Sequence, residues 1–288
     1  MLSDQTLAKL DALTLALKDH ARGGAGGVRR SRMLGSSAEF SDFRSYAPGD
    51  DIRRIDWNAY ARFDKLFLKL FMEEQEMCLT LIVDASKSMG FGEPGKWLFV
   101  RQLAEAIGYL ALRNGDKVRL VALHDGRALE SALMSGRASM LRMSEFLDGI
   151  EPGGDARMDE QITRLRMSAP RGLSVVISDL LYPGEAEQAL SSLVFRRQQT
   201  ALIQVLSPEE LHPEYAGALR LLDSETEQAI ELMMNRDTLD DYERTLTAMR
   251  ARIEARANKL GYGYQLLTSD QDLVNEAMRQ LAGMGLVQ

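Results

Sequence analysis

The sequence is poor in the residues that carry cross-linking and common covalent catalysis. Among its 288 residues the single cysteine is Cys78, which excludes an internal disulfide. Its three histidines, His20, His124 and His212, are scattered along the chain. Neither a Ser–His–Asp nor a Cys–His arrangement can be assembled around them, so catalysis by an activated serine or cysteine is not expected.

Long apolar runs are also missing. No uninterrupted run approaches the roughly 18–20 residues that a helix needs to span a bilayer. The first residues, Met1 to Gln5, contain Asp4 where a secretory signal would carry positive charge. From these absences we expect a cytoplasmic protein without membrane insertion.

Basic charge is scarce as well. The formal net charge is −7, which argues against a protein that holds nucleic acid through phosphate contacts. The basic cluster Arg29-Arg30-Ser31-Arg32 is too short to reverse this balance. Hydrophobic content of 45% and charged content of 27% are typical of a soluble globular protein. The length allows one large α/β domain, alone or with a smaller appended part.

What the sequence does contain, from residue 76 onward, is a regular alternation of short apolar runs and stretches of helical periodicity. The expected strands cover residues 79–83, 118–123, 173–178, 201–206 and 263–267, with a short edge strand at 127–131 and a hairpin at 219–232. The expected helices cover residues 96–113, 137–147, 159–167, 185–197, 238–259 and 270–284. This alternation predicts βαβ units and a doubly wound, mostly parallel sheet with helices on both faces.

The first 75 residues have a different character. Leucines at helical spacing predict a helix that Ser3 or Asp4 caps, and Gly23 to Gly27 form a flexible joint after it. The helix could dock on its own domain, which we favour, or on a partner. Residues 35–76 predict a compact, non-helical segment that turns extended at 65–72. We therefore divide the chain into an N-terminal part, 1–75, and a main domain, 76–288.

A carboxylate and two hydroxyls follow the expected strand 79–83 in the pattern Asp84-x-Ser86-x-Ser88. Open α/β sheets bind ligands in the crevice outside the carboxyl ends of their strands. Hard cations such as Mg²⁺ accept oxygen ligands of these kinds while keeping several waters. Serine-rich turns also commonly cap helices, so the position after a buried strand is what favours a site.

Two more acids are expected at the same edge. Asp179 follows the strand 173–178, and Asp155 ends the glycine-rich turn that starts at Glu151. Each could simply cap a helix or turn. Together with Asp84 they would repel one another unless a cation or protons intervened. The set therefore predicts a divalent-metal site, with Mg²⁺, Mn²⁺ or Ca²⁺ as the ion. Its expected ligands are Asp84, Ser86, Ser88, Asp155 and Asp179.

These residues carry a resemblance. Asp84-x-Ser86-x-Ser88 resembles the metal-ion-dependent adhesion site of von Willebrand factor A domains. The strings Arg44-x-Tyr46-x-Pro48-Gly-Asp-Asp51 and Arg54-Ile-Asp-Trp57 closely resemble the bacterial domain-of-unknown-function 58 family, and the match extends from Arg29 to the C-terminus. The resemblance implies a von Willebrand A-like fold. It also implies a non-enzymatic adaptor that works with a MoxR-type AAA+ ATPase on protein clients.

Residue by residue, Asp84, Ser86 and Ser88 match the first motif of the adhesion site, and Asp179 matches its later acid. The usual third element is a threonine in a Gly-Gly-Thr turn, where this chain has Asp155. Tyr182 stands where relatives often have a further acid. An added carboxylate would bind the ion more tightly and attract a partner's acid less. Alternatively, Asp155 makes the metal site defective and the surface binds partners without metal.

A second acidic cluster, Asp50, Asp51 and Asp56, lies near Arg53 and Arg54. It is open to two interpretations, a metal-dependent phosphohydrolase or nuclease, or a turn whose acids pair with the adjacent arginines. We favour the second, because no histidine or lysine nearby supplies acid–base chemistry. A metal-dependent hydrolase that uses the carboxylates of the main site remains the alternative to the adaptor, and a scaffold with an empty site is a third possibility.

The segment Gly90 to Lys96 nearly matches a phosphate-binding P-loop. A P-loop needs Ser or Thr directly after the lysine to bind Mg²⁺, and Trp97 occupies that position. Nucleotide binding is therefore not expected here.

Overall fold

The structure, a computed structural model, describes residues 2–16, 39–47, 52, 55–72, 77–167, 172–181, 186–214, 217–222 and 229–288. The chain divides into two compact units. The larger comprises Met1–Arg22 together with Met77–Gln288, and the smaller comprises Gly23–Glu76. The larger unit contains the sheet and the candidate site.

The sheet of the larger unit has six strands in the order β10-β7-β6-β3-β4-β5. Their bounds are β3 Cys78–Asp84, β4 Lys117–His124, β5 Arg127–Glu130, β6 Gly172–Ser178, β7 Gln198–Leu206 and β10 Gly263–Thr268. All neighbours are parallel except β4 and β5, which pair antiparallel. Every residue of β3 and β6 is buried, because strands at the centre of a parallel sheet are covered on both faces. The predicted mostly parallel sheet is confirmed.

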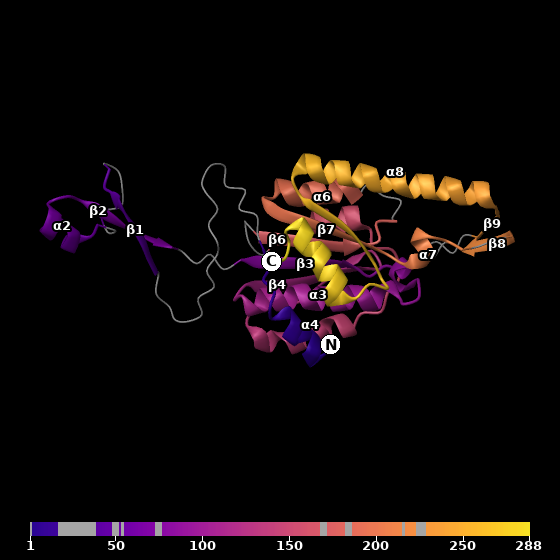
Figure 1. The fold of residues 1–288 in the computed structure, drawn as a ribbon, viewed down its shortest axis with the longest axis horizontal. Helices are drawn as coiled ribbons and strands as arrows, with labels where there is room; N and C mark the ends of the chain where they lie inside the picture. The colour runs from indigo at the N-terminus through magenta and orange to yellow at the C-terminus, as the bar shows by residue number, and fades with distance from the viewer. Residues whose placement is uncertain are drawn as a thin grey trace. The chain divides into compact units, whose positions relative to one another are not determined.

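Helices cover both faces of this sheet (Figure 1). Their bounds are α1 Asp4–Leu10, α3 Lys96–Arg113, α4 Met140–Asp148, α5 Met158–Arg164, α6 Ala186–Phe195, α7 Pro208–Leu211, α8 Arg236–Leu260 and α9 Met278–Met284. Leu81 and Val83 of β3 pack in one core with α1, α3, α4 and α9, whereas Ile82 packs in a second core with α5, α6 and α8. The alternation follows from the period of two along a strand.

Shorter elements complete the larger unit. They are the 3₁₀ helices η2 Lys87–Gly90 and η3 Arg137–Ser139, the π-helical turn η4 Leu273–Ala277, and the antiparallel hairpin of β8 Gly217–Leu222 and β9 Ala229–Met234. Each strand and helix expected from residue 76 onward is present, with bounds shifted by a few residues. Among the described residues, no helix is both long enough and apolar enough to cross a membrane.

Helix α1 packs on the main domain. Leu10 is fully buried, and the Tyr109 hydroxyl of α3 donates a 2.6 Å hydrogen bond to Asp11 Oδ1. Thr14 and Gln288 exchange backbone hydrogen bonds of 2.7 Å. The predicted boundary at residue 75 is therefore corrected for this helix: its apolar face is buried in the core of the main domain, so it does not belong with the segment that follows it.

In the smaller unit, β1 Glu39–Ser45 pairs antiparallel with β2 Phe67–Met72, and α2 Trp57–Phe63 lies between them in sequence. The expectation of a non-helical segment was wrong at α2. Asp56 starts this helix, because its Oδ1 accepts hydrogen bonds from the backbone N–H of Asn58 and Ala59, at 2.9 and 3.2 Å.

Candidate functional site

Strand β3 places Asp84 at the carboxyl edge of the sheet, as predicted. The side chain is buried, and both of its oxygens are engaged. Oδ1 accepts a 2.9 Å hydrogen bond from the backbone N–H of Ser86, and Oδ2 accepts a 2.6 Å hydrogen bond from the Ser178 hydroxyl. Ser178 is the last residue of β6, the neighbour of β3, so the bond joins the ends of two adjacent strands.

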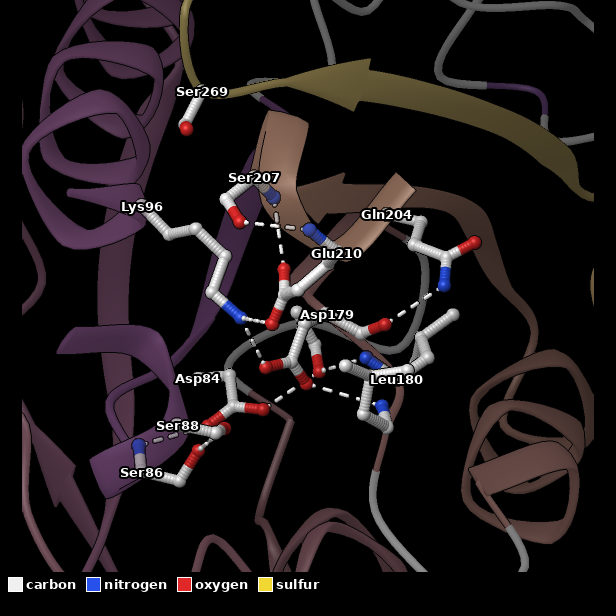
Figure 2. A network of polar contacts seen from close by, with 12 residues as sticks. Asp84, Ser86, Ser88, Lys96, Asp179, Leu180, Gln204, Ser207, Glu210 and Ser269 are labelled. Atoms are coloured by element: carbon white, nitrogen blue, oxygen red, sulfur yellow. Dashed lines mark hydrogen bonds and ion pairs between the residues drawn. The ribbon is translucent and has the colours of Figure 1, made fainter. Parts of the chain in front are cut away.

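The two motif serines lie directly beside this carboxylate (Figure 2). Ser86 is buried and stands at the N-cap position of the short helix η2, where its hydroxyl makes no capping hydrogen bond, while Ser88 is partly exposed. Their hydroxyl oxygens are 3.1 Å apart. The first motif therefore forms a compact group of oxygen donors.

Asp179 follows β6 and completes the buried part of the site. Its Oδ1 accepts a 3.1 Å hydrogen bond from the backbone N–H of Leu181, and its Oδ2 lies 2.7 Å from Lys96 Nζ. The Gln204 side-chain amide donates a 2.7 Å hydrogen bond to the backbone carbonyl of Asp179. The side chain thus points toward Asp84 on one side and Lys96 on the other (Figure 2).

Sequence reasoning considered Lys96 only as the lysine of a near P-loop, yet its side chain reaches the candidate site. Lys96 is fully buried, and its ammonium bonds Asp179 Oδ2 at 2.7 Å and Glu210 Oε1 at 2.6 Å. Burial by itself lowers the pKa of Lys96, but Asp179 and Glu210 more than offset this, and the pKa is raised. The ammonium is therefore charged and committed to two carboxylates, which is not the state of a phosphate-binding lysine.

Glu210 was not foreseen at all. It lies in the short helix α7, where it and Ser207 form a capping box: Glu210 Oε2 accepts from the Ser207 N–H at 2.8 Å, and Ser207 Oγ accepts from the Glu210 N–H at 3.2 Å. Burial raises the pKa of Glu210, and Lys96 opposes the shift. The string Ser-Pro-Glu-Glu after a strand was the signal that could have identified the box.

The electrostatics of the pair Asp84 and Asp179 are unfavourable as they stand. Burial, and then the charge of Asp179, raise the pKa of Asp84 to about 6. Hydrogen bonds from Ser178 and Ser86 act in the opposite direction without cancelling the shift. A cation beside the two carboxylates would relieve this repulsion.

The turn that carries Asp155 lies against the motif, but the Asp155 carboxylate is bonded to Arg157. The turn that carries it contacts the motif loop, since Gly153 N–H donates to the Ala85 carbonyl at 2.9 Å and Lys87 N–H donates to the Gly154 carbonyl at 3.0 Å. The Asp155 carboxylate itself accepts a 2.8 Å hydrogen bond from the Arg157 N–H through Oδ1, and its Oδ2 lies 3.7 Å from Arg157 Nε.

The donor set fits a hard divalent cation. Asp84, Ser86, Ser88 and Asp179 offer oxygen atoms only, as Mg²⁺ and related ions require. Within the part of the chain that the structure describes, no three His, Cys, Asp or Glu side chains gather closely enough to hold a metal. An ion here would therefore be held by two carboxylates, hydroxyls and water. Tyr182, and the cluster residues Asp50 and Asp51 with their arginines, lie outside the described residues.

Several solved structures are similar to this chain in fold at low sequence identity. BatB from Bacteroides thetaiotaomicron is 16% identical, with a TM-score of 0.44 over 72% of this chain and 98% of that chain. The VWA domain of SpRpn10 is 10% identical, with a TM-score of 0.45 over 71% and 94%. Manganese-loaded TRAP protein of Plasmodium vivax is 16% identical, with a TM-score of 0.37 over 74% and 75%.

In sequence, the chain is similar to the uncharacterized protein Rv1480 of Mycobacterium tuberculosis. The two are 27% identical over 281 residues, which cover 96% of this chain and 88% of the relative. The model of the family described as protein of unknown function DUF58 matches residues 42–252, most of the larger unit and part of the smaller. The chain belongs to the DUF58 family, as its sequence predicted.

Proposed function

We propose that this protein is a non-enzymatic, divalent-metal-dependent adaptor that binds protein partners through the carboxyl edge of its sheet. The observation that supports this proposal most is the grouping of the Asp84 carboxylate with the Ser86 and Ser88 hydroxyls, next to Asp179. In open α/β folds this edge is where ligands bind. The family resemblance further suggests a MoxR-type AAA+ ATPase as a partner and a protein as its client.

The ion would be Mg²⁺, Mn²⁺ or Ca²⁺, with Asp84, Ser86, Ser88 and Asp179 as ligands directly or through water. Asp155 would join them through water or after its side chain leaves Arg157. An ion held by few carboxylates keeps positive charge to attract an acidic side chain of a partner. The chain's contribution is to hold these oxygens together at the ends of β3 and β6 and to keep them partly buried.

A metal-dependent hydrolase with the same carboxylates is the alternative. It would need a general base near the site. Lys96 is charged and bound to Asp179 and Glu210, so it does not supply one. A screen of phosphoesters and peptides with Mg²⁺ or Mn²⁺ separates the two functions. Turnover that Asp84→Ala abolishes would contradict the adaptor.

The main test compares metal binding and partner capture by the wild type and by an Asp84→Ala/Ser86→Ala variant. We expect calorimetric titration to show Mn²⁺ binding to the wild type and none to the variant. We also expect a MoxR-type ATPase to be captured by the wild type in Mg²⁺, and lost on chelation or in the variant. Ser174→Ala, a buried serine further back on β6, is the matched control and should behave as the wild type. Equal capture by all forms would contradict the proposal.

A further inference from the structure

The most unusual charge in the larger unit is the ammonium of Lys96. The residue is the first of α3, a position where the partial positive charge of the helix N-terminus disfavours a cation. The side chain is nevertheless fully buried and carries its charge to within 2.7 Å of Asp179 and 2.6 Å of Glu210. A buried charge is retained only where its partners are well placed.

Those partners are themselves fixed. Glu210 cannot turn away from Lys96 without breaking the Ser207 capping box, and Tyr242 holds the same helix by a 2.6 Å hydrogen bond from its hydroxyl to the Glu210 carbonyl. Asp179 is held by the Leu181 N–H. The ammonium is therefore locked beside one of the carboxylates that face the candidate ion.

From this geometry we infer that Lys96 is a resident positive charge that sets the strength of the metal site. It offsets part of the negative charge of Asp179, so this carboxylate attracts an added cation less strongly than it would without Lys96. The inference rests on the proposed function, since it concerns the same site. Lys96 positions Asp179 and sets the charge of the site, and it is not itself a metal ligand. The ligands are the side-chain oxygens named under the proposed function.

The test uses two substitutions that break the same ion pair but change the charge of the site in opposite directions. Lys96→Met removes a positive charge, and Mn²⁺ should bind at least about tenfold more tightly than to the wild type. Glu210→Gln removes a negative charge and leaves the ammonium to Asp179 alone, so Mn²⁺ should bind more weakly. Calorimetric titration on the full chain measures both affinities.

A merely structural role gives a different pattern, because loss of the ion pair would then weaken Mn²⁺ binding in both variants. That result, or an unchanged affinity in Lys96→Met, overturns the inference. If Lys96→Met does not fold, Lys96→Met/Glu210→Gln is compared with Glu210→Gln, and the double variant should again bind Mn²⁺ more tightly.

The outcomes also separate this inference from the proposed function. A wild type that binds Mn²⁺ while Lys96→Met binds it less tightly supports the function and overturns the inference. A wild type without measurable binding, together with a Lys96→Met variant that binds, overturns the metal-dependent function and supports the resident charge. Absence of binding in both contradicts both.

Discussion

The Ser178 hydroxyl donates a 2.6 Å hydrogen bond to Oδ2 of Asp84, and this bond joins the carboxyl ends of β6 and β3. The same Ser178 oxygen accepts a 3.0 Å hydrogen bond from the Leu180 N–H, and so shapes the turn that presents Asp179. One serine that the sequence did not single out therefore holds the Asp84 carboxylate directly and also bonds the backbone just after Asp179.

Ser178→Ala should lower the free energy of unfolding by about 2 kcal/mol at pH 7.5, because a buried carboxylate loses a charge-assisted hydrogen bond. Urea unfolding in chelator measures the change. Ser174→Ala is the matched control on the same strand: its hydroxyl is buried and has no hydrogen-bond partner among the described residues, so its loss should cost almost nothing. Equal losses in the two variants would contradict this role of Ser178.

Asp84→Asn should make the metal-free protein more stable at neutral pH. The pKa of Asp84 is raised from 3.8 to about 6, so its contribution to stability is fully present below about pH 4 and is lost as the pH rises through 6. Asparagine does not ionise and avoids this loss. The difference in unfolding free energy between variant and wild type should grow by at most about 3 kcal/mol between pH 4 and 6. Above pH 6 it should level off.

Chemical unfolding across this pH range, in the presence of chelator, checks the prediction. Asp155→Asn is the control, because Asp155 is part-exposed and bound to Arg157 rather than to the buried carboxylates. A difference between Asp84→Asn and wild type that is constant from pH 4 to 7 would show that repulsion and burial do not act on Asp84 as described.

Asp155→Thr should weaken Mn²⁺ binding, because the turn that carries Asp155 contacts the motif loop and the substitution removes a negative charge nearby. Arg157→Ala should strengthen binding, since it frees the Asp155 carboxylate from its closest cation. Calorimetric titration measures both. Tighter Mn²⁺ binding in Asp155→Thr would show that the Asp155 carboxylate does not help to hold the ion. It would favour the usual threonine of the Gly-Gly-Thr turn at this position.

Arg113→Ala should loosen α1 from the main domain. The Arg113 guanidinium donates hydrogen bonds to the carbonyl oxygens of Asp11, at 2.6 Å, and Leu13 just beyond the end of this helix. We expect exchange protection of the amides in α1 to fall by about tenfold, while the amides of β3 keep theirs. Tyr109→Phe removes a single bond to Asp11 and should have a smaller effect. Unchanged protection in Arg113→Ala would show that apolar packing alone holds the helix.

The fold, and the placement of Asp84 and Asp179 at one edge of the sheet, could be predicted because both depend on local patterns. Apolar runs of strand length alternate with helical periodicity, and that alternation leads to a parallel sheet. In such a sheet Asp84 and Asp179 must emerge at one edge, since β3 and β6 are neighbours and run in the same direction. The helix α2 was missed because seven residues are too few to show a helical period, its apolar side chains are not buried, and its start depends on one cap, Asp56.

The amino-acid sequence by itself determined which segments become strands and helices, and the edge of the sheet at which the acids and serines appear. Only the tertiary structure decided how charges are paired there: the Lys96 ammonium bonds Glu210, which is 114 residues away along the chain, and the Asp155 carboxylate bonds Arg157. The reason is physical. Periodicity reports which backbone segments are buried, whereas the partner of a long charged side chain depends on where separate elements come to pack.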